Sequence, residues 1–289
     1  MELNSEVVTA PPRAAATVVM LRDAPEGLEV FLLKRHGNSD VLGGAYVFPG
    51  GKVDAADAGL AGHLDQSPAE LHAALGETEL DLPTATSFYV AALREAFEES
   101  GVLFATEADT AQLQQASALL RQGLAFDAML AQLALQLDTR SVLPWSRWIT
   151  PRMPSVSNKR FDTRFFVAAV PHEQTARHDD YEATESVWLA PRAALQQYWD
   201  GRIALAPPQI MSLAHLARHE TVAGVLAEAR RRPPPVILPE PFDQDGMRVI
   251  CYPGDERHPV SERALPGPTR LHFRNKRFEP HGGFEGLFA

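Results

Sequence analysis

"LREAFEESGV", residues 93–102, places three glutamates within five residues. On a helix, Glu95, Glu98 and Glu99 stand at i, i+3 and i+4 and therefore share a face, while Arg94 can pair with Glu98 four residues on. Like charges this close repel, and exposed ion pairs recover only tenths of a kcal/mol, so the cluster destabilises the fold unless a cation binds it. Mg²⁺ and Mn²⁺ favour such oxygen ligands. The alternative is a solvated helix face, the usual meaning of a charge run.

The surrounding residues predict the helix itself, over about 84–100. An apolar stripe with the spacing i, i+3 and i+7 directs one face at a core; it consists of Val90, Leu93 and Phe97. Pro83 and Thr84 are start signals, and Gly101 is a stop signal.

Strands and helices alternate along the rest of the chain without a regular βαβ rhythm, which predicts a mixed α+β domain. Strands are expected at 14–21, 28–34, 45–48, 161–170 and 183–190, the first two joined by a hairpin turn. Helices are expected at 107–137, from Pro191 to about Trp199, and as one long helix from Pro207 to about Arg230. Trp145 and Trp148, near the end of the 107–137 segment, are interpreted as packing aromatics.

The main domain is expected to span 10–232, with an extended strand-and-loop extension at 233–289 packed on it. The extension begins after Arg232-Pro233-Pro234-Pro235, where the composition shifts to proline, glycine and charge. Within the main domain, an insertion at 58–86 and a helical segment at 105–140 are distinguished.

Composition limits the classes of function. The chain has 289 residues, 45% of them hydrophobic, and 37 acidic against 27 basic residues, a net charge of −10. This balance argues against nucleic acid as a partner, and no apolar run is long enough to span a membrane. The N-terminus carries no secretory signal pattern, and the single cysteine, Cys251, excludes an internal disulfide. The expected location is the cytoplasm, and the expected partner is a small molecule.

The sequence FPGG (48–51) followed by REAFEESGV (94–102) resembles the Nudix box, G-x5-E-x7-R-E-U-x-E-E-x-G-U, where U is aliphatic. Gly51 takes the position of the leading glycine, and Asp57 takes that of the first glutamate. The seven-residue spacer is replaced by residues 58–93, which number 36. Long insertions at this point are found in the branch related to the peroxisomal coenzyme A diphosphatase of animals. PWSRWITP (144–151), RFDTRFF (160–166) and IALAPPQ (203–209) are also similar to that branch.

The resemblance implies a Nudix fold, a mixed β-sheet sandwiched between helices, and a metal-dependent diphosphatase. It implies that Glu95, Glu98 and Glu99, with the carbonyl of Gly51, hold Mg²⁺ or Mn²⁺, and that Arg94 orients the carboxylates. The general base remains open: Glu98 or Glu99 in the box, or Glu182 or Glu185 outside it. The alternative for Glu182 and Glu185 is that they are ordinary acidic residues of the surface.

Coenzyme A diphosphatases carry a further pattern upstream of FPGG, L-L-T-x-R-[SA]-x3-R-x3-G. Here Arg35 and Gly44 are retained, Leu33 replaces the threonine, and Asp40 replaces the second arginine. A carboxylate in place of a phosphate-binding cation argues against a simple transfer of substrate. The expected substrate contacts are Arg35, Lys34, Arg164 and Phe48.

The favoured function is hydrolysis of coenzyme A or acyl-CoA to adenosine 3′,5′-bisphosphate and a phosphopantetheine. One alternative is the same chemistry on another nucleoside diphosphate derivative, such as NADH or ADP-ribose. Another is a non-catalytic domain that senses a nucleotide, although such a domain would be free to lose its glutamates. A homodimer is compatible with the sequence. His215 and His219 stand at i, i+4 but have no third ligand nearby in the sequence, and Cys251 is interpreted as structural.

Overall fold

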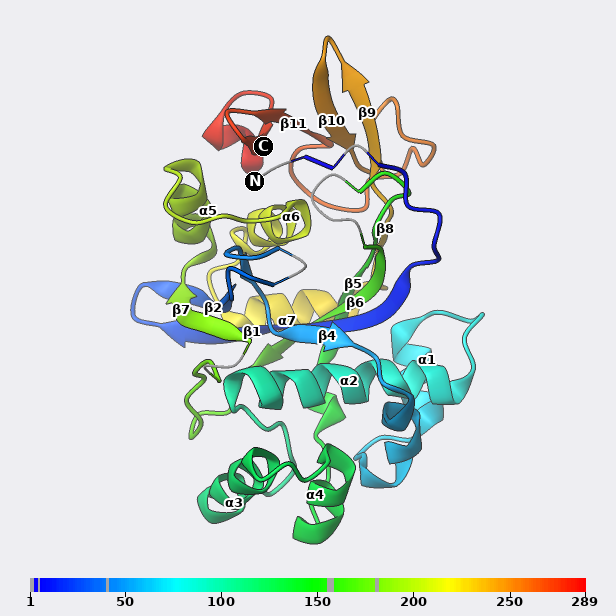
Figure 1. The fold of residues 1–289 in the computed structure, drawn as a ribbon, viewed down its shortest axis with the longest axis vertical. Coiled ribbons are helices and arrows are strands. Elements are labelled where there is room, and N and C mark those ends of the chain that lie inside the picture. The colour runs from blue at the N-terminus through cyan, green and yellow to red at the C-terminus, as the bar shows by residue number, and fades with distance from the viewer. Residues whose placement is uncertain (1–2, 5, 40–41, 155–158, 180–181) are drawn as a thin grey trace.

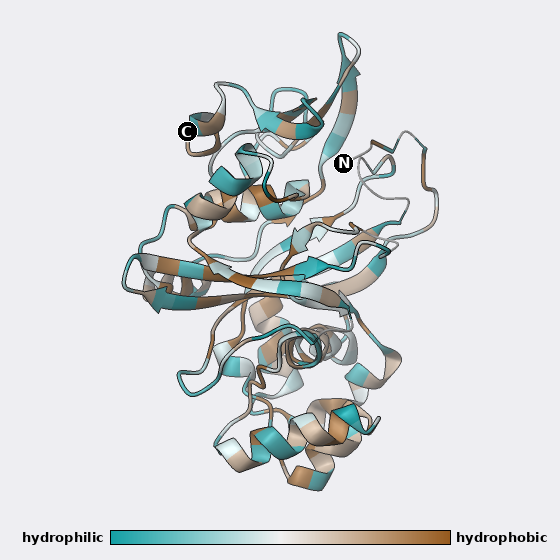
Figure 2. Cartoon of the chain, turned by 60° about the vertical axis from the view of Figure 1, so that its left-hand side comes forward, coloured by the Kyte–Doolittle hydropathy of each residue, from teal (hydrophilic) through white to brown (hydrophobic). Residues whose placement is uncertain are grey.

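The computed structural model describes residues 3–4, 6–39, 42–154, 159–179 and 182–289. A mixed β-sheet lies between two layers of helices, with α2 on one side and α5 and α6 on the other (Figure 1). Figure 2 shows the strands nearly edge-on between these layers. The predicted α+β class is therefore confirmed.

The central sheet has eight strands in the order β3-β2-β1-β6-β5-β8, with β4 paired to β1 and β7 paired to β2. Its strands are β1 (Arg13–Ala24), β2 (Gly27–Arg35), β3 (Tyr46–Val47), β4 (Gly50–Lys52), β5 (Leu143–Ile149), β6 (Phe161–Ala169), β7 (Ala183–Leu189) and β8 (Val236–Ile237). The predicted hairpin is present, because β1 and β2 pair antiparallel up to Ala24 and Gly27. β1 also pairs in parallel with β6.

The sheet divides beside β1. The first half of this strand pairs with β4, through Ala15–Thr17, whereas its second half pairs with β2, through Leu21–Ala24. β2 and β4 are therefore bonded to different halves of one strand and diverge. The FPGG stretch leads from β3 into β4, at this fork in the sheet, and its two glycines begin β4.

The helices form two groups, each packed against one face of the sheet. The helices are α1 (Pro68–Leu75), α2 (Leu82–Ser100), α3 (Thr110–Arg121), α4 (Phe126–Leu133), α5 (Pro191–Trp199), α6 (Pro207–Leu216) and α7 (Val222–Arg231), with 3-10 turns at Ala55–His63, Thr139–Ser141 and Phe284–Leu287. Buried residues of α1, α2 and α4 share one hydrophobic cluster with β1 residues Ala16 and Val18. Those of α5, α6 and α7 share a second cluster with Val19 and Leu21. The alternation of side chains along β1 thus supplies both cores.

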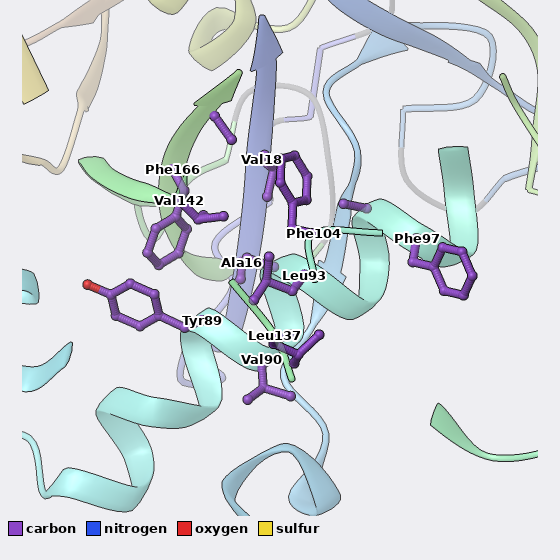
Figure 3. Close-up of a cluster of buried hydrophobic side chains, with 14 of the residues drawn as sticks. Ala16, Val18, Tyr89, Val90, Leu93, Phe97, Phe104, Leu137, Val142 and Phe166 are labelled. Atoms are coloured by element: carbon purple, nitrogen blue, oxygen red, sulfur yellow. The ribbon is translucent and has the colours of Figure 1, made fainter. Parts of the chain in front are cut away.

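Helix α2 is buried on nearly all sides. Asp81 caps its first turn by accepting a hydrogen bond from the Thr84 N–H, and Gly101 ends it in the left-handed conformation at φ 71°. Leu93 lies beside Ala16 of β1, whereas Val90 lies on another side of the helix, near Leu137 (Figure 3). Each such side chain, fully buried, contributes about 1.5–3 kcal/mol. The glutamate-bearing helix is therefore held firmly against the sheet.

Three sequence predictions need correction. The 107–137 segment is two short helices, α3 and α4, because Gly123 breaks it at φ 84°. The long helix from Pro207 ends at Leu216, and α7 restarts where Thr221 accepts a hydrogen bond from the Gly224 N–H. Trp145 and Trp148 lie on β5, where both are buried.

The C-terminal residues form a second sheet, of four antiparallel strands in the order β12-β11-β10-β9. Its strands are β9 (Glu240–Gln244), β10 (Met247–Cys251), β11 (Arg270–Arg274) and β12 (Arg277–Pro280). Ile250, Tyr252, Leu271 and Phe278 belong to the second hydrophobic cluster of the main sheet. Among the residues described here, none of the helices combines the length and the apolar character that crossing a bilayer requires.

Candidate active site

A cleft of about 630 Å³ opens at the fork in the sheet. Its walls come from β1, β2, the FPGG turn and α2, with α6 closing one side. They include Arg35, Phe48, Gly51, Glu95, Lys159 and Gln209. Residues far apart in the sequence thus meet at the place where β2 and β4 diverge.

Arg94 joins the glutamates of α2 to the start of the insertion. Its Nε donates a hydrogen bond to Asp57 Oδ1 at 3.0 Å and its Nη2 donates to Oδ2 at 3.1 Å, a bidentate pair. Its Nη1 donates to Glu95 at 2.8 Å and to Glu98 at 3.2 Å. Asp57 is only 1% exposed and also accepts a hydrogen bond from the Asp54 N–H. Asp57 therefore holds the arginine in place, and the predicted orienting role of Arg94 agrees with these contacts.

Glu99 is held by the turn on the other side of the cleft. The backbone N–H of Gly50 donates to Glu99 Oε2 at 2.8 Å. The side chain of Glu99 is buried, whereas that of Glu98 is partly exposed. The FPGG turn and α2 are thus connected directly through a carboxylate.

Burial raises the pKa values of all three glutamates. It raises the pKa of Glu95 to about 7, against the opposing charge of Arg94. It raises the pKa of Glu99 to about 8, although the Gly50 N–H and the charge of Arg35 act in the opposite direction. Burial also raises the pKa of Glu98. Carboxyl groups that bind protons near neutral pH occur where negative charge is concentrated and water is scarce.

The charges at the base of the cleft do not balance. Arg94 contacts four carboxyl groups, those of Asp54, Asp57, Glu95 and Glu98, and Glu99 adds a fifth nearby. One guanidinium cannot compensate five ionised groups, so the buried ones either keep protons, as the raised pKa values of Glu95 and Glu99 indicate, or require a further cation. The donors are all carboxylate oxygens, the type that Mg²⁺ and Mn²⁺ prefer, so they fit a divalent ion.

The glutamate oxygens are not gathered on one point. Glu95 and Glu98 turn toward Arg94, and Glu99 turns toward Gly50, so the three groups do not lie within 4.8 Å of one another. Chelation therefore needs rotation of these side chains. The absence of a side chain at Gly51 leaves space for the Glu95 carboxylate, because a Cβ at this position would overlap it.

Arg35 and Glu182 face the same cleft. Arg35 Nη2 lies 3.8 Å from Glu182 Oε2, and the charge of Glu182 raises the pKa of both Glu95 and Glu99. Arg35 Nε is buried without a hydrogen-bond partner among the described residues. The structure thus brings Arg35 and Glu182 to the glutamates, and Phe48 lines the cleft while it packs against Phe165.

Lys34, Glu185 and Arg164 are placed elsewhere, which corrects the predicted set. Lys34 and Glu185 pair with each other at 3.4 Å beside Tyr46, outside the cleft, because neighbouring residues of β2 point to opposite faces of the sheet. Arg164 is buried in an ion pair with Glu77 and stacks on the Phe88 ring. Asp40, the residue that departs from the upstream pattern, lies outside the described residues.

Sequence reasoning assigned no role to Gln209 and did not indicate the contact that Asp57 makes. Gln209 is in the first turn of α6 and reaches the cleft, and its Oε1 is buried without a partner among the described residues. The Pro207-Pro208 pair, which fixes the start of α6, was the available signal for Gln209. Asp57 was aligned with the first glutamate of the Nudix box, and its pairing with Arg94 could be found only in three dimensions.

His215 and His219 have a third neighbour that the sequence did not indicate. Glu228 on α7 lies 2.8 Å from His215 Nε2 and 2.9 Å from His219 Nε2, and Arg232 donates to the same carboxylate. Metal-bound histidines normally donate their second N–H to an acceptor, but His215 Nδ1 is buried without a partner within the described part of the chain. The cluster fits a hydrogen-bonded connection between α6 and α7 rather than a metal site.

Comparison with known proteins places this geometry in a family. The profile of the NUDT19 Nudix domain matches residues 61–216. The acyl-coenzyme A diphosphatase NUDT19 of Xenopus laevis is 27% identical over 80% of this chain and 71% of its own length. The putative nudix hydrolase 7 of Caenorhabditis elegans is 28% identical over 91% of this chain and 80% of its own.

A solved structure has the same fold. The NUDIX hydrolase of Alicyclobacillus acidocaldarius superposes with a TM-score of 0.62, is 27% identical, and covers 76% of this chain and 97% of its own. The profile match spans more than half of the chain and includes all of α2, which carries the three glutamates. The chain therefore belongs to the Nudix hydrolases, in the branch defined by the NUDT19 Nudix domain.

Proposed function

We propose that this Nudix hydrolase is a divalent-metal-dependent diphosphatase of coenzyme A or acyl-CoA. The products are adenosine 3′,5′-bisphosphate and 4′-phosphopantetheine or its acyl ester. The observation that carries the proposal is the excess of carboxylates around Arg94 at the base of an open cleft. Relatives named acyl-coenzyme A diphosphatase support the choice of substrate.

Glu95, Glu98 and Glu99 are the proposed holders of Mg²⁺ or Mn²⁺, with the carbonyl of Gly51 as a further candidate. Such an ion, when bound, neutralises diphosphate oxygens and lowers the pKa of a water molecule that it holds. Arg94 keeps Glu95 and Glu98 oriented through its hydrogen bonds, and Asp57 fixes Arg94. Arg35, whose Nε has no partner in the part of the chain that the structure describes, is the proposed donor to a diphosphate oxygen.

Hydrolysis also needs a group that accepts the proton of the attacking water. Glu182 is a candidate because its side chain faces the cleft and is 56% exposed, so that it can move toward a bound substrate. Glu99 and Glu98 are the other candidates.

The test is a substrate panel with Mg²⁺ or Mn²⁺ and product identification by mass spectrometry. The panel contains coenzyme A, acyl-CoA, NADH, ADP-ribose and dinucleoside polyphosphates. We expect the highest kcat/KM with a CoA substrate, and no turnover after chelation of the metal. A higher kcat/KM with NADH or ADP-ribose rejects the CoA assignment, and turnover in the presence of chelator rejects the metal. The homodimer and the cytoplasmic location remain predictions.

A further inference from the structure

A second cavity, of about 200 Å³, adjoins the active-site cleft; we call it the side cavity. Its walls are mostly apolar and include Trp148, Phe165, Pro151, Pro207, Pro239 and Ile250. Pro239 and Ile250 come from the C-terminal part of the chain, beyond the residues that match the family profile. The second sheet therefore supplies one wall of a cavity whose other walls belong to β5, β6 and α6.

The side cavity and the cleft share part of their lining. Thr17, Phe161, Thr163 and Gln209 line both, as do Leu42 and Lys159. A long substrate whose diphosphate lies at the glutamates can therefore extend past these residues into the side cavity. Its apolar end would then be removed from water.

Gln209 stands at the boundary between the two cavities. Its Oε1 is buried and has no hydrogen-bond partner among the described residues, which is costly for a carbonyl oxygen unless a ligand or water supplies a donor. The pantetheine arm of coenzyme A contains two secondary amides, each with an N–H donor. A pantetheine amide at the boundary satisfies Gln209 and directs the thioester end toward the apolar walls.

We propose that the side cavity binds the acyl chain of an acyl-CoA and that the C-terminal sheet thereby sets the chain-length preference. This inference rests on the proposed function. An adenine ring is the competing occupant, but a buried purine presents several ring nitrogens that need polar partners. The walls beyond Gln209 are proline, aromatic and aliphatic side chains, which suit a saturated chain.

The test compares binding and hydrolysis of coenzyme A, butyryl-CoA and octanoyl-CoA by wild type, Ile250→Ala and Ile250→Phe. Binding is measured by calorimetry in EDTA, so that it does not depend on turnover. Each methylene that enters the cavity is expected to tighten binding by about fourfold until the cavity is full. Ile250→Ala should raise the affinity for octanoyl-CoA relative to coenzyme A, and Ile250→Phe should lower it. The ratio of kcat/KM values should change in the same directions.

The matched control is Ile203→Ala, which truncates another buried isoleucine outside both cavities and should leave the ratio at the wild-type value. Thermal unfolding establishes that each variant is folded. Equal dissociation constants for coenzyme A and octanoyl-CoA in the wild type overturn the acyl assignment. So does an equal loss of affinity for both ligands in the Ile250 variants, the result expected for a buried adenine. If none of the CoA compounds is hydrolysed but binding still depends on chain length, the proposed function is rejected. The assignment of the side cavity to the acyl chain then stands.

Discussion

Arg94 and Asp57 show how one residue pair can organise the glutamates of the site. The guanidinium of Arg94 is largely buried, and although burial alone lowers its pKa, the hydrogen bonds of Asp57 and the charge of Glu95 raise the pKa overall. A permanently charged arginine, fixed on one side by Asp57 and by the Lys52 carbonyl, presents its Nη1 to Glu95 and Glu98. Asp57 reaches Arg94 despite being one methylene shorter than glutamate, because the 3-10 turn in which it lies, Ala55–His63, packs against α2.

Glu99→Gln and Glu98→Gln each test the proposed metal site. Each amide keeps the shape of the side chain but loses the negative charge that a divalent ion requires. We expect kcat to fall by about 100-fold or more, with little change in the thermal unfolding temperature. Glu173→Gln, on an exposed loop, is the control and should retain wild-type kcat. Wild-type rates in both glutamine variants would falsify the metal assignment.

Gly51→Ala tests whether the Glu95 carboxylate must lie against the backbone turn. The added Cβ overlaps the end of the Glu95 side chain, which can move aside without disturbing the fold. A displacement of about 1 Å at a reacting centre lowers rates by about 100-fold, so kcat should fall by that order while stability stays close to wild type. The matched control is Gly59→Ala, where a Cβ meets no atom within 4 Å. Similar kcat values for the two variants contradict the proposed role of Gly51.

At the scale of elements, α2 was predictable because its signals are local and agree with one another. The apolar stripe, the glycine stop and the spacing of the glutamates all follow from residues within one helix. The break between α6 and α7 was missed because the apolar pattern continues through Thr221, whose capping role depends on its conformation. Lys34 and Glu185 were assigned to the site together with their sequence neighbours Arg35 and Glu182. Nearness in the sequence does not determine which face of the sheet a side chain takes, and the two pairs lie apart.

His215 on α6 should make stability depend on pH. Burial lowers its pKa from 6.5 to about 4, despite the opposing charge of Glu228. As the pH falls, the unfolded chain therefore binds a proton at this histidine before the folded protein does. The stability that the neutral, buried His215 gives the folded state is fully present above about pH 6.5 and is lost as the pH falls toward about 4. We expect wild type to lose about 2–3 kcal/mol more than His215→Leu between these values. Urea unfolding from pH 6.5 to pH 4 measures this, and identical losses in the two proteins contradict it.

At the scale of the molecule, the main sheet and the C-terminal sheet share one hydrophobic cluster. The sequence indicated an extended C-terminal part from its proline and glycine content, but not what it covers. The reason is physical: Tyr252 packs on Trp148 of β5 and Phe278 is bonded to Tyr198 of α5, and such distant pairings leave no local pattern in the sequence. The side cavity was unpredictable for the same reason, because its walls come from segments spread from Thr17 to Ile250.

Tyr198→Phe tests how the C-terminal sheet is held. The Tyr198 hydroxyl donates to the Phe278 carbonyl at 3.0 Å and accepts from the Phe278 N–H at 2.7 Å. Its loss leaves two buried backbone groups unpaired, so the free energy of unfolding should fall by about 1–3 kcal/mol. Tyr252→Phe is the matched control, because that hydroxyl is buried without a partner among the described residues. Chemical unfolding of both variants should show the loss only for Tyr198; equal losses contradict the argument.

The fork beside β1 has a consequence for how such proteins diversify. Because the gap arises where backbone pairing passes from β4 to β2, its existence does not depend on the identity of the residues around its rim. Mutations at rim positions such as His36 and Ser39 can therefore retune which molecules enter without abolishing the entrance. An ancestral scaffold of this kind can give rise to enzymes with different substrate specificities through changes at the rim alone, while its carboxylates stay in place.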